Sequence, residues 1–359
     1  MTWSVWLKKF DWVLLALALA IVVLGALTFY QSGAREEEIF RKQLLFSLAG
    51  AVLMISVSFA DYRIFKNYSA ASVILYAISI IFLLAALGFS PVRGARSWII
   101  LGGYGFQPSE FTKLTLLVLL AKYFSQKHAE IYRWHHILAS GVYAAAPAWL
   151  TLLQPDFGST MVFVALWLAM LFFSGIKRRH LLTILMVGLM IFSFAWFLAF
   201  KPYQKDRIFS FLNPYLDPRG IGYNVIQSQT TFGSGRIWGT FFDNSKNLTV
   251  LVPERYTDFA FAAYGQKFGF AGVVLLLGLL AGLSWRLGAV AARVSNNFAR
   301  LYILGLMTVI IIHSFSNAGM NLGVLPITGI PFSFLSYGGS HLLTLMVGLG
   351  VVESIKIRS

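Results

Sequence analysis

The residues best suited to chemistry lie in a polar stretch between positions 251 and 270. This stretch, LVPERYTDFAFAAYGQKFGF, places Glu254 and Asp258 just before an apolar run. A carboxylate beside lipid is costly to keep and usually serves a function. Thr257 is a good N-cap and Pro253 interrupts the preceding structure, which places Asp258 in the first turn of a helix. We therefore expect Asp258 to be the catalytic base, although a carboxylate there also complements the helix dipole.

Two arginines stand close together in the segment RGARSW, at positions 93–98. Arg93 and Arg96 are suited to hold a diphosphate near a bilayer surface, because guanidinium groups make paired, charge-assisted hydrogen bonds. The alternative is ordinary interfacial anchoring, with Trp98 in an aromatic belt. The spacing alone does not separate these two interpretations.

A glutamate and a lysine follow Pro108 in the segment QPSEFTK. Proline suits the first turn of a helix. Glu110 and Lys113 are three residues apart, so they share a helix face and can pair. A neutral pair costs less to bury than either charge alone. A structural ion pair is the favoured interpretation for Lys113, whereas Glu110 stays open between that role and substrate binding.

Two further polar elements complete the set of candidates. Asp156 follows Pro155 where a helix would begin, which favours N-capping, and it also remains a candidate for orienting substrate or binding a cation. Ser336, a candidate for substrate binding, lies in SFLSYGGS at 333–340, after a run rich in proline and glycine. Irregular backbone at membrane depth must line a cavity or be covered by protein. No zinc-type H-E-x-x-H motif and no nucleotide-binding P-loop is present.

Composition sets the fold class. The chain has 359 residues, of which 58% are hydrophobic and 12% are charged, whereas soluble domains carry about 25% charged residues. Several apolar runs approach the roughly 20 residues needed to cross a bilayer. These values predict an all-α polytopic membrane protein. The net charge of +15 is expected from basic residues that flank helices and meet anionic lipid, rather than from nucleic-acid binding. The absence of cysteine excludes disulfides.

Ten transmembrane helices are expected. We place them at 12–30, 43–60, 70–88, 109–124, 136–153, 158–175, 181–200, 268–285, 300–320 and 335–354. The basic residues of the short loops predict that the N- and C-termini are cytoplasmic. A large extracytoplasmic loop, about residues 201–267, then separates helices 7 and 8, and an amphipathic piece near 222–231 is suited to lie along the interface. We expect residues 1–359 to form a single membrane domain.

The polar segments, in this order, resemble the SEDS family (shape, elongation, division and sporulation) of bacterial membrane proteins. The resemblance rests on RGARSW at 93–98, QPSE at 107–110 with Lys113, QPDFG at 154–158, FLNP at 211–214, Asp217-Pro218, Gly222-Tyr223 with Gln227-Ser228, PERYTDF at 253–259, NAGMN at 317–321 and SYGGS at 336–340. It covers essentially the whole chain. The short termini and residues 325–331 look more like the rod-shape branch of the family than the division branch.

The resemblance implies a ten-helix fold and peptidoglycan glycosyltransferase activity. Lipid II would be polymerised on the outer face of the plasma membrane, with undecaprenyl diphosphate leaving. The family's essential aspartate maps onto Asp258. The resemblance also implies a partner, a class B penicillin-binding protein with transpeptidase activity, within the elongation machinery.

The expected reaction gives each candidate a role. Asp258 removes a proton from the acceptor's sugar 4-hydroxyl, and that oxygen attacks the anomeric carbon of the lipid-linked donor. Arg93, Arg96 and Arg255 neutralise the departing diphosphate, or a divalent cation (Mg or Mn) assists, because electrostatic stabilisation is often the largest catalytic contribution. Glu254 is a supporting candidate for substrate binding.

Three departures and two rival functions accompany this interpretation. Tyr256 stands where the family usually has histidine, Gln266-Lys267 replaces a common acidic pair, and the segment after Gly235 lacks the usual Gly-Lys-Gly.

A lipid II flippase would use the same polar cluster, and a scaffold would only anchor a partner enzyme. The enzyme is favoured over the flippase because the carboxylates gather on the outer face rather than at the midplane, where transporter sites usually lie.

Overall fold

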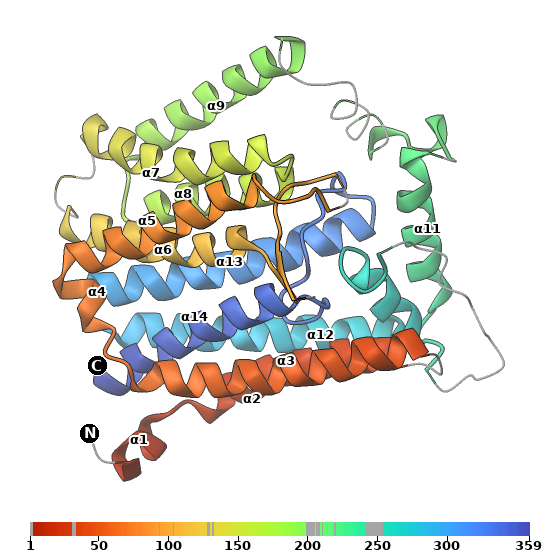
Figure 1. The fold of residues 1–359 in the computed structure, drawn as a ribbon, viewed down its shortest axis with the longest axis horizontal. Coiled ribbons are helices and arrows are strands. Elements are labelled where there is room, and N and C mark those ends of the chain that lie inside the picture. Colours follow the sequence, from red (N-terminus) through yellow and green to blue (C-terminus); the bar gives the residue numbers. More distant parts are fainter. Residues whose placement is uncertain are drawn as a thin grey trace.

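The computed structural model describes residues 3–30, 34–92, 94–102, 104–127, 130, 133–198, 205, 209, 211–218, 220–241 and 254–359. Most of these residues form long helices that run beside one another, with both termini at one end of the bundle (Figure 1). The helices are α1 (Trp3–Lys9), α2 (Trp12–Phe29), α3 (Ala34–Phe59), α4 (Arg63–Asn67), α5 (Ser69–Ala86), α6 (Pro108–Gln126), α7 (Trp134–Leu153), α8 (Phe157–Phe173), α9 (Arg178–Leu198), α11 (Ile221–Ser234), α12 (Ala260–Arg293), α13 (Asn297–Asn321) and α14 (Gly339–Arg358).

A helix lies at each of the ten predicted positions. Eight of the described helices are long and apolar enough to cross a membrane: α2, α3, α5, α7, α9, α12, α13 and α14. Helix α8 is apolar but has only 17 residues. Helix α6 carries Glu110, Lys113 and Lys122, and all three side chains are buried. Other helices surround α6, so its polar residues are covered by protein rather than by lipid.

The other end of the bundle carries the irregular segments. Strands β1 (Ile99–Leu101) and β2 (Tyr104–Phe106) pair antiparallel, with Ile100 opposite Gly105. The 3-10 turn Pro214–Leu216 precedes α11, which confirms a helix at the predicted amphipathic piece. Helix α11 lies across the end of the bundle farthest from the termini (Figure 1).

Helix α12 differs from its predicted span, because it begins at Ala260 instead of residue 268 and is interrupted at Gly269. Gly269 has φ 65° and ψ −168°, a conformation essentially restricted to glycine. A Cβ added there would lie 2.3 Å from the backbone nitrogen of Gly239. The amides of Phe270 and Ala271 instead donate to the carbonyls of Arg236 and Ile237. The apolar run therefore begins at the break, and a short helix precedes it.

We expect Gly269→Ala to lower the free energy of unfolding by at least about 2 kcal/mol, because the new methyl group meets backbone and the conformation disfavours a side chain. Thermal unfolding of the purified protein in detergent measures this effect. Gly278→Ala is the matched control, since it lies in the same helix with open space around its Cα, and alanine favours helix. Equal midpoints for the two variants would contradict the structural reason given for the break.

Candidate functional site

Asp258 lies in a turn formed by residues 254–259, directly before α12. The predicted N-cap role of Thr257 is wrong: the helix begins at Ala260, and the hydroxyl of Thr257 donates to the Glu254 carboxylate at 3.2 Å. The side-chain oxygen of Asn321, on α13, accepts from the amide of Ala262 at 3.0 Å instead. A residue 59 positions away thus accepts the hydrogen bond of a backbone amide at the start of α12, and a local sequence pattern cannot reveal that contact.

Two buried asparagines fix the backbone of Asp258. The side-chain amides of Asn317 and Asn321 donate to its carbonyl oxygen at 2.8 and 3.0 Å. Both asparagines are fully buried, and they lie four residues apart on one face of α13. Asn317 also donates to the carbonyl of Ile330 at 2.8 Å. Asn317 therefore holds both the turn that carries Asp258 and the loop before α14, and Asn321 adds a second bond to the turn.

The segment before α14 contacts the Asp258 turn a second time. The hydroxyl of Ser336 donates to the carbonyl of Thr257 at 2.7 Å and accepts from the amide of Phe332 at 2.9 Å. The amide of Tyr337 donates to the carbonyl of Tyr256 at 2.8 Å. The sequence predicts that Ser336 binds substrate, but its hydroxyl is engaged by backbone groups on both sides. Its observed contacts are those of a residue that positions the turn.

Glu36, at the start of α3, anchors the same turn from a third direction. Its carboxylate pairs with Arg255 and accepts a hydrogen bond from the hydroxyl of Tyr256 at 2.8 Å. The Arg255 guanidinium lies 4.8 Å from the centre of the Tyr256 ring, and Phe29 meets that ring edge-on. Burial raises the pKa of the Tyr256 hydroxyl above its usual value. The hydrogen bond from Arg255 lowers this pKa and the hydrogen bond to Glu36 raises it, so that the net shift is upward. The tyrosine at this position thus keeps its proton and links α3 to the Asp258 turn.

We expect Tyr256→Phe to lower the free energy of unfolding by about 1–3 kcal/mol, because its hydroxyl makes two hydrogen bonds and each is worth about 0.5–1.5 kcal/mol net. The ring keeps its contacts with Phe29 and Arg255, so the loss is confined to the two hydrogen bonds of the hydroxyl, the one it donates to Glu36 and the one it accepts from Arg255. Thermal unfolding of the variant and of the wild type measures the difference. Tyr215→Phe is the matched control, because the side chain of Tyr215 is 73% exposed. An equal shift in both variants would contradict the role of the hydroxyl.

The Asp156 segment confirms the predicted N-cap. One carboxylate oxygen of Asp156 accepts from the amide of Ser159 at 3.0 Å, and the other accepts from the Ser159 hydroxyl at 2.8 Å and from the side chain of Gln107 at 3.5 Å. The exposed Arg96 donates its amide to the carbonyl of Gln154 at 3.2 Å. Arg93 lies outside the described residues. The Arg96 segment, the start of α6 and the start of α8 therefore meet.

Close backbone contacts bring this group to the Asp258 turn. A Cβ added to Gly158, at the start of α8, would lie 2.4 Å from the carbonyl oxygen of Thr328. A Cβ added to Gly329 would lie 3.6 Å from a carboxylate oxygen of Asp258. The segment 328–330 thus separates the start of α8 from Asp258. The polar clusters predicted to converge do meet at one end of the bundle.

Glu110 and Lys113 form the predicted ion pair at 2.7 Å, with both side chains 3% exposed. Two histidines that the sequence reasoning did not assign extend it: His313 lies 3.1 Å from the Lys113 ammonium, and His341 lies 2.8 Å from Glu110. His313 also meets the carbonyl of Pro331 at 3.2 Å. The four side chains connect α6, α13 and α14 beneath the loop that touches Asp258.

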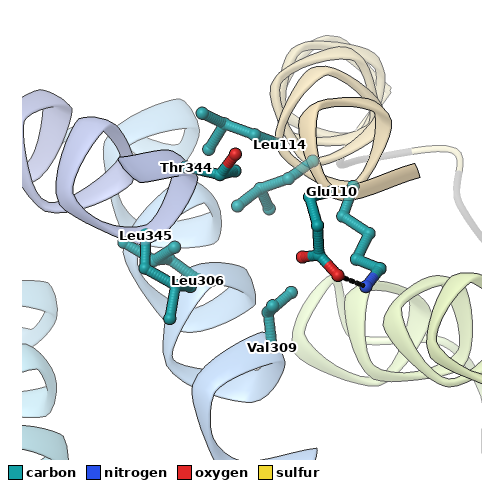
Figure 2. Close-up of a pocket in the computed structure, with 8 residues that line it drawn as sticks. Glu110, Leu114, Leu306, Val309, Thr344 and Leu345 are labelled. Carbon is teal, nitrogen blue, oxygen red and sulfur yellow. Dashed lines mark hydrogen bonds and ion pairs between the residues drawn. The ribbon is translucent and has the colours of Figure 1, made fainter. Parts of the chain in front are cut away.

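Figure 2 shows the small cavity beside this ion pair, where Glu110 and Thr344 are surrounded by leucine and valine side chains. Its volume is about 10 Å³, which is room for one water molecule. A sugar or a diphosphate does not fit there. The contacts of Glu110 and Lys113 are therefore with the protein, and any influence on substrate passes through the loop above them.

The missed residues carried a signal in the sequence. His313, Asn317 and Asn321 recur every fourth residue in a mostly apolar helix, and polar residues within membrane helices usually face the protein interior and serve a function. That spacing predicts one polar stripe facing the bundle. Glu36 had no comparable signal, because it begins a helix with several charged residues.

The chain resembles known proteins over nearly its whole length. Residues 6–359 match the family described as Cell cycle protein, which groups FtsW, RodA and SpoVE. The peptidoglycan glycosyltransferase MrdB of Escherichia coli K12 is 31% identical over 347 residues, covering 96% of this chain and 93% of that protein. Stage V sporulation protein E of Bacillus subtilis is 32% identical over 358 residues, covering 96% of each.

Solved structures agree with these sequence relatives. A chain from a structure described as "Structural coordination of polymerization and crosslinking by a peptidoglycan synthase complex" superposes with a TM-score of 0.83 at 32% identity, covering 97% of both chains. The rod shape-determining protein RodA of Thermus thermophilus superposes with a TM-score of 0.71 at 29% identity, covering 97% of this chain and 96% of that one. The chain therefore belongs to the SEDS family of polytopic membrane proteins that contains FtsW, RodA and SpoVE.

Proposed function

We propose that this protein is a peptidoglycan glycosyltransferase that polymerises lipid II on the outer face of the bacterial plasma membrane during cell elongation, releasing undecaprenyl diphosphate. The observation that carries the proposal is the anchoring of Asp258. Two buried asparagines hold its carbonyl, and its carboxylate lies against the loop at Gly329. A carboxylate fixed at the polar end of an apolar bundle is suited to act on a lipid-linked sugar. The glycosyltransferase named among the relatives supports this reaction class.

The proposed reaction is an inverting sugar transfer. Asp258 accepts the proton of the acceptor's 4-hydroxyl as that oxygen forms a bond to the anomeric carbon of the donor. The bond between that carbon and the diphosphate oxygen breaks, and undecaprenyl diphosphate leaves with the electron pair. Arg93, Arg96 and Arg255 would neutralise the departing charge, because fixed cations stabilise charge that develops in the transition state. Asp156 and Glu254 would orient the sugars.

A divalent cation, Mg or Mn, is the cofactor proposed for the diphosphate. Magnesium is usually held by one or two carboxylates together with phosphate oxygens. The Asp258 carboxylate would supply one oxygen of that kind and the substrate diphosphate the others, and the ion would add positive charge beside the leaving group. Among the described residues, the two groups with three metal-type ligands are elsewhere: Glu110 with His313 and His341, and Glu130 with His135 and His136.

The proposed topology has ten membrane crossings with both termini in the cytoplasm. The helices found at the predicted positions support the count, and the end of the bundle that carries α11 lies opposite the termini. The basic residues of the short loops support the orientation. Residues 201–267 would then lie outside the cell membrane, where lipid II is consumed.

We also propose a stable complex with a class B penicillin-binding protein, whose transpeptidase would cross-link the new strands, together with other membrane proteins of the elongation machinery. The similarity to a chain from a peptidoglycan synthase complex supports such an assembly.

Reconstitution into liposomes that contain lipid II tests the function. We expect glycan strands to form on the side that carries Asp258, with consumption of lipid II and release of undecaprenyl diphosphate. Lipid II that changes leaflet without being polymerised would instead identify a flippase. Empty liposomes and liposomes with the Asp258→Asn protein are the controls.

A further inference from the structure

A basic pocket lies at the end of the bundle that holds the termini, far from Asp258. Three cations line it: Arg286 and Arg293 on α12 and Lys356 on α14. Ala289, Val290 and Val294 form its apolar wall, and the hollow measures about 190 Å³. Its lining contains three basic side chains and no acidic one. It is thus a concave site with both positive charge and an apolar surface.

The buried carboxylate of Asp11 holds two of the cations in place. The Arg286 Nε lies 2.7 Å and the Lys356 Nζ lies 2.9 Å from the same oxygen of Asp11, whose side chain is 1% exposed. Asp11 also caps α2, since it accepts from the amide of Leu14 at 3.3 Å. Glu353 is a second carboxylate in this group, since it accepts from the amide of Asp11 at 2.9 Å. Three cations thus face two carboxylates, so positive charge remains in excess. Within the described part of the chain, the terminal N–H groups of Arg286 make no hydrogen bond.

Arg293 adds a third cation without an ion pair to any described residue. It follows Arg286 by seven residues, which places both on one face of α12, two turns apart. A cation in the last turn of a helix complements the helix dipole, but that effect fades within one turn. The dipole therefore accounts for Arg293 and not for Arg286. The dipole does not explain the hollow between them either.

Tryptophan side chains place the pocket at the depth of lipid headgroups. Trp285, next to Arg286, is 80% exposed, and Trp12, next to Asp11, is 48% exposed. Exposed tryptophans of membrane proteins concentrate at the two membrane–water interfaces. An anion bound here would meet cations on one side and apolar surface on the other. A phosphate attached to acyl chains matches both features, whereas a free phosphate matches only the first.

We propose that Arg286, Arg293 and Lys356 form a binding site for the phosphodiester headgroup of an anionic phospholipid. Basic pockets between membrane helices bind such headgroups in this way. The Arg guanidinium groups would hold the phosphate oxygens through charge-assisted hydrogen bonds. The glycerol and the upper acyl chain would lie on Val290 and Val294. This site is independent of the proposed reaction at Asp258.

Native mass spectrometry of the purified full-length protein tests the proposal, with phosphatidylglycerol and phosphatidylcholine as probes. We expect phosphatidylglycerol to be retained preferentially, and Arg293→Gln to weaken its binding about fivefold, the value of one basic residue near a lipid surface. Arg293 has no ion-pair partner among the described residues to leave unpaired, so this variant should fold. Arg293→Lys should keep most of the affinity because it keeps the charge.

Arg300→Gln is the matched control, because Arg300 is exposed near the start of α13, at the same end of the bundle but outside the pocket. We expect it to leave phosphatidylglycerol binding unchanged. An equal loss in Arg293→Gln and Arg300→Gln would overturn the pocket in favour of diffuse surface charge. Equal protection from thermal unfolding by inorganic phosphate and by phosphatidylglycerol would overturn the proposal of a lipid site and indicate a site for a soluble anion.

Discussion

Asp258→Asn is expected to reduce lipid II polymerisation by about 10²–10⁴-fold, the usual contribution of a general base. Asparagine has nearly the same shape but cannot accept the proton of the acceptor hydroxyl. Asn317 and Asn321 donate to the carbonyl oxygen of residue 258, so the substitution leaves these two bonds in place. The initial rate of glycan-strand formation, measured with the purified protein, gives the effect.

Two comparisons make this prediction specific. Asp61→Asn carries the same chemical change at the opposite end of the bundle, where Asp61 accepts from the amide of Arg63 at 2.9 Å, and it should retain full activity. The thermal midpoint of Asp258→Asn should match that of the wild type. A variant that melts normally and polymerises at the wild-type rate would remove Asp258 from the role of base.

Lys113→Met is expected to destabilise the protein by about 3–5 kcal/mol, the cost of leaving one member of a buried ion pair alone. Glu110 would remain 2% exposed with only histidine beside it. Because the cluster also reaches Pro331 through His313, the loop before α14 should loosen and activity should fall with stability. Thermal unfolding and expression level in membranes measure the effect.

Lys122→Met is the matched control, on the same helix and 6% exposed. The Lys122 ammonium donates to the carbonyl of Lys66 and leaves no carboxylate unpaired, so its loss should cost only about 1 kcal/mol. The double variant Glu110→Gln with Lys113→Met should recover much of the stability, since it removes both charges. A Lys113→Met protein of normal stability that fails to polymerise would instead assign Lys113 to substrate.

Helix positions were predictable because apolar runs near 20 residues must be helical in lipid. The ion pair of Glu110 with Lys113 and the cap at Asp156 were also predictable, because both depend on residues three positions apart. The start of α12 was not, because Asn321 from another helix caps it and Gly239 packs against its break at Gly269. Sequence patterns describe neighbours along the chain, and these contacts join distant segments.

In the candidate site, too, features local in the sequence were predictable and contacts between distant segments were not. The sequence indicated Asp258 from its position beside an apolar run, whereas the partners that hold it came only from the structure. The presence of tyrosine at position 256 is explained by the hydrogen bond that its hydroxyl donates to Glu36. Ser336 was expected to face substrate, and its bonds to Thr257 and Phe332 instead show a positioning contact. Long-range hydrogen bonds decided each of these cases.

The most direct test of the central claim is polymerisation of purified lipid II by this protein in complex with a transpeptidase-inactive partner. Glycan strands should form at a rate proportional to the amount of this protein, and they should disappear when Asp258→Asn replaces the wild type. Strand formation that persists with Asp258→Asn, or that never occurs with the wild-type complex, would contradict the assignment of this protein as the polymerase.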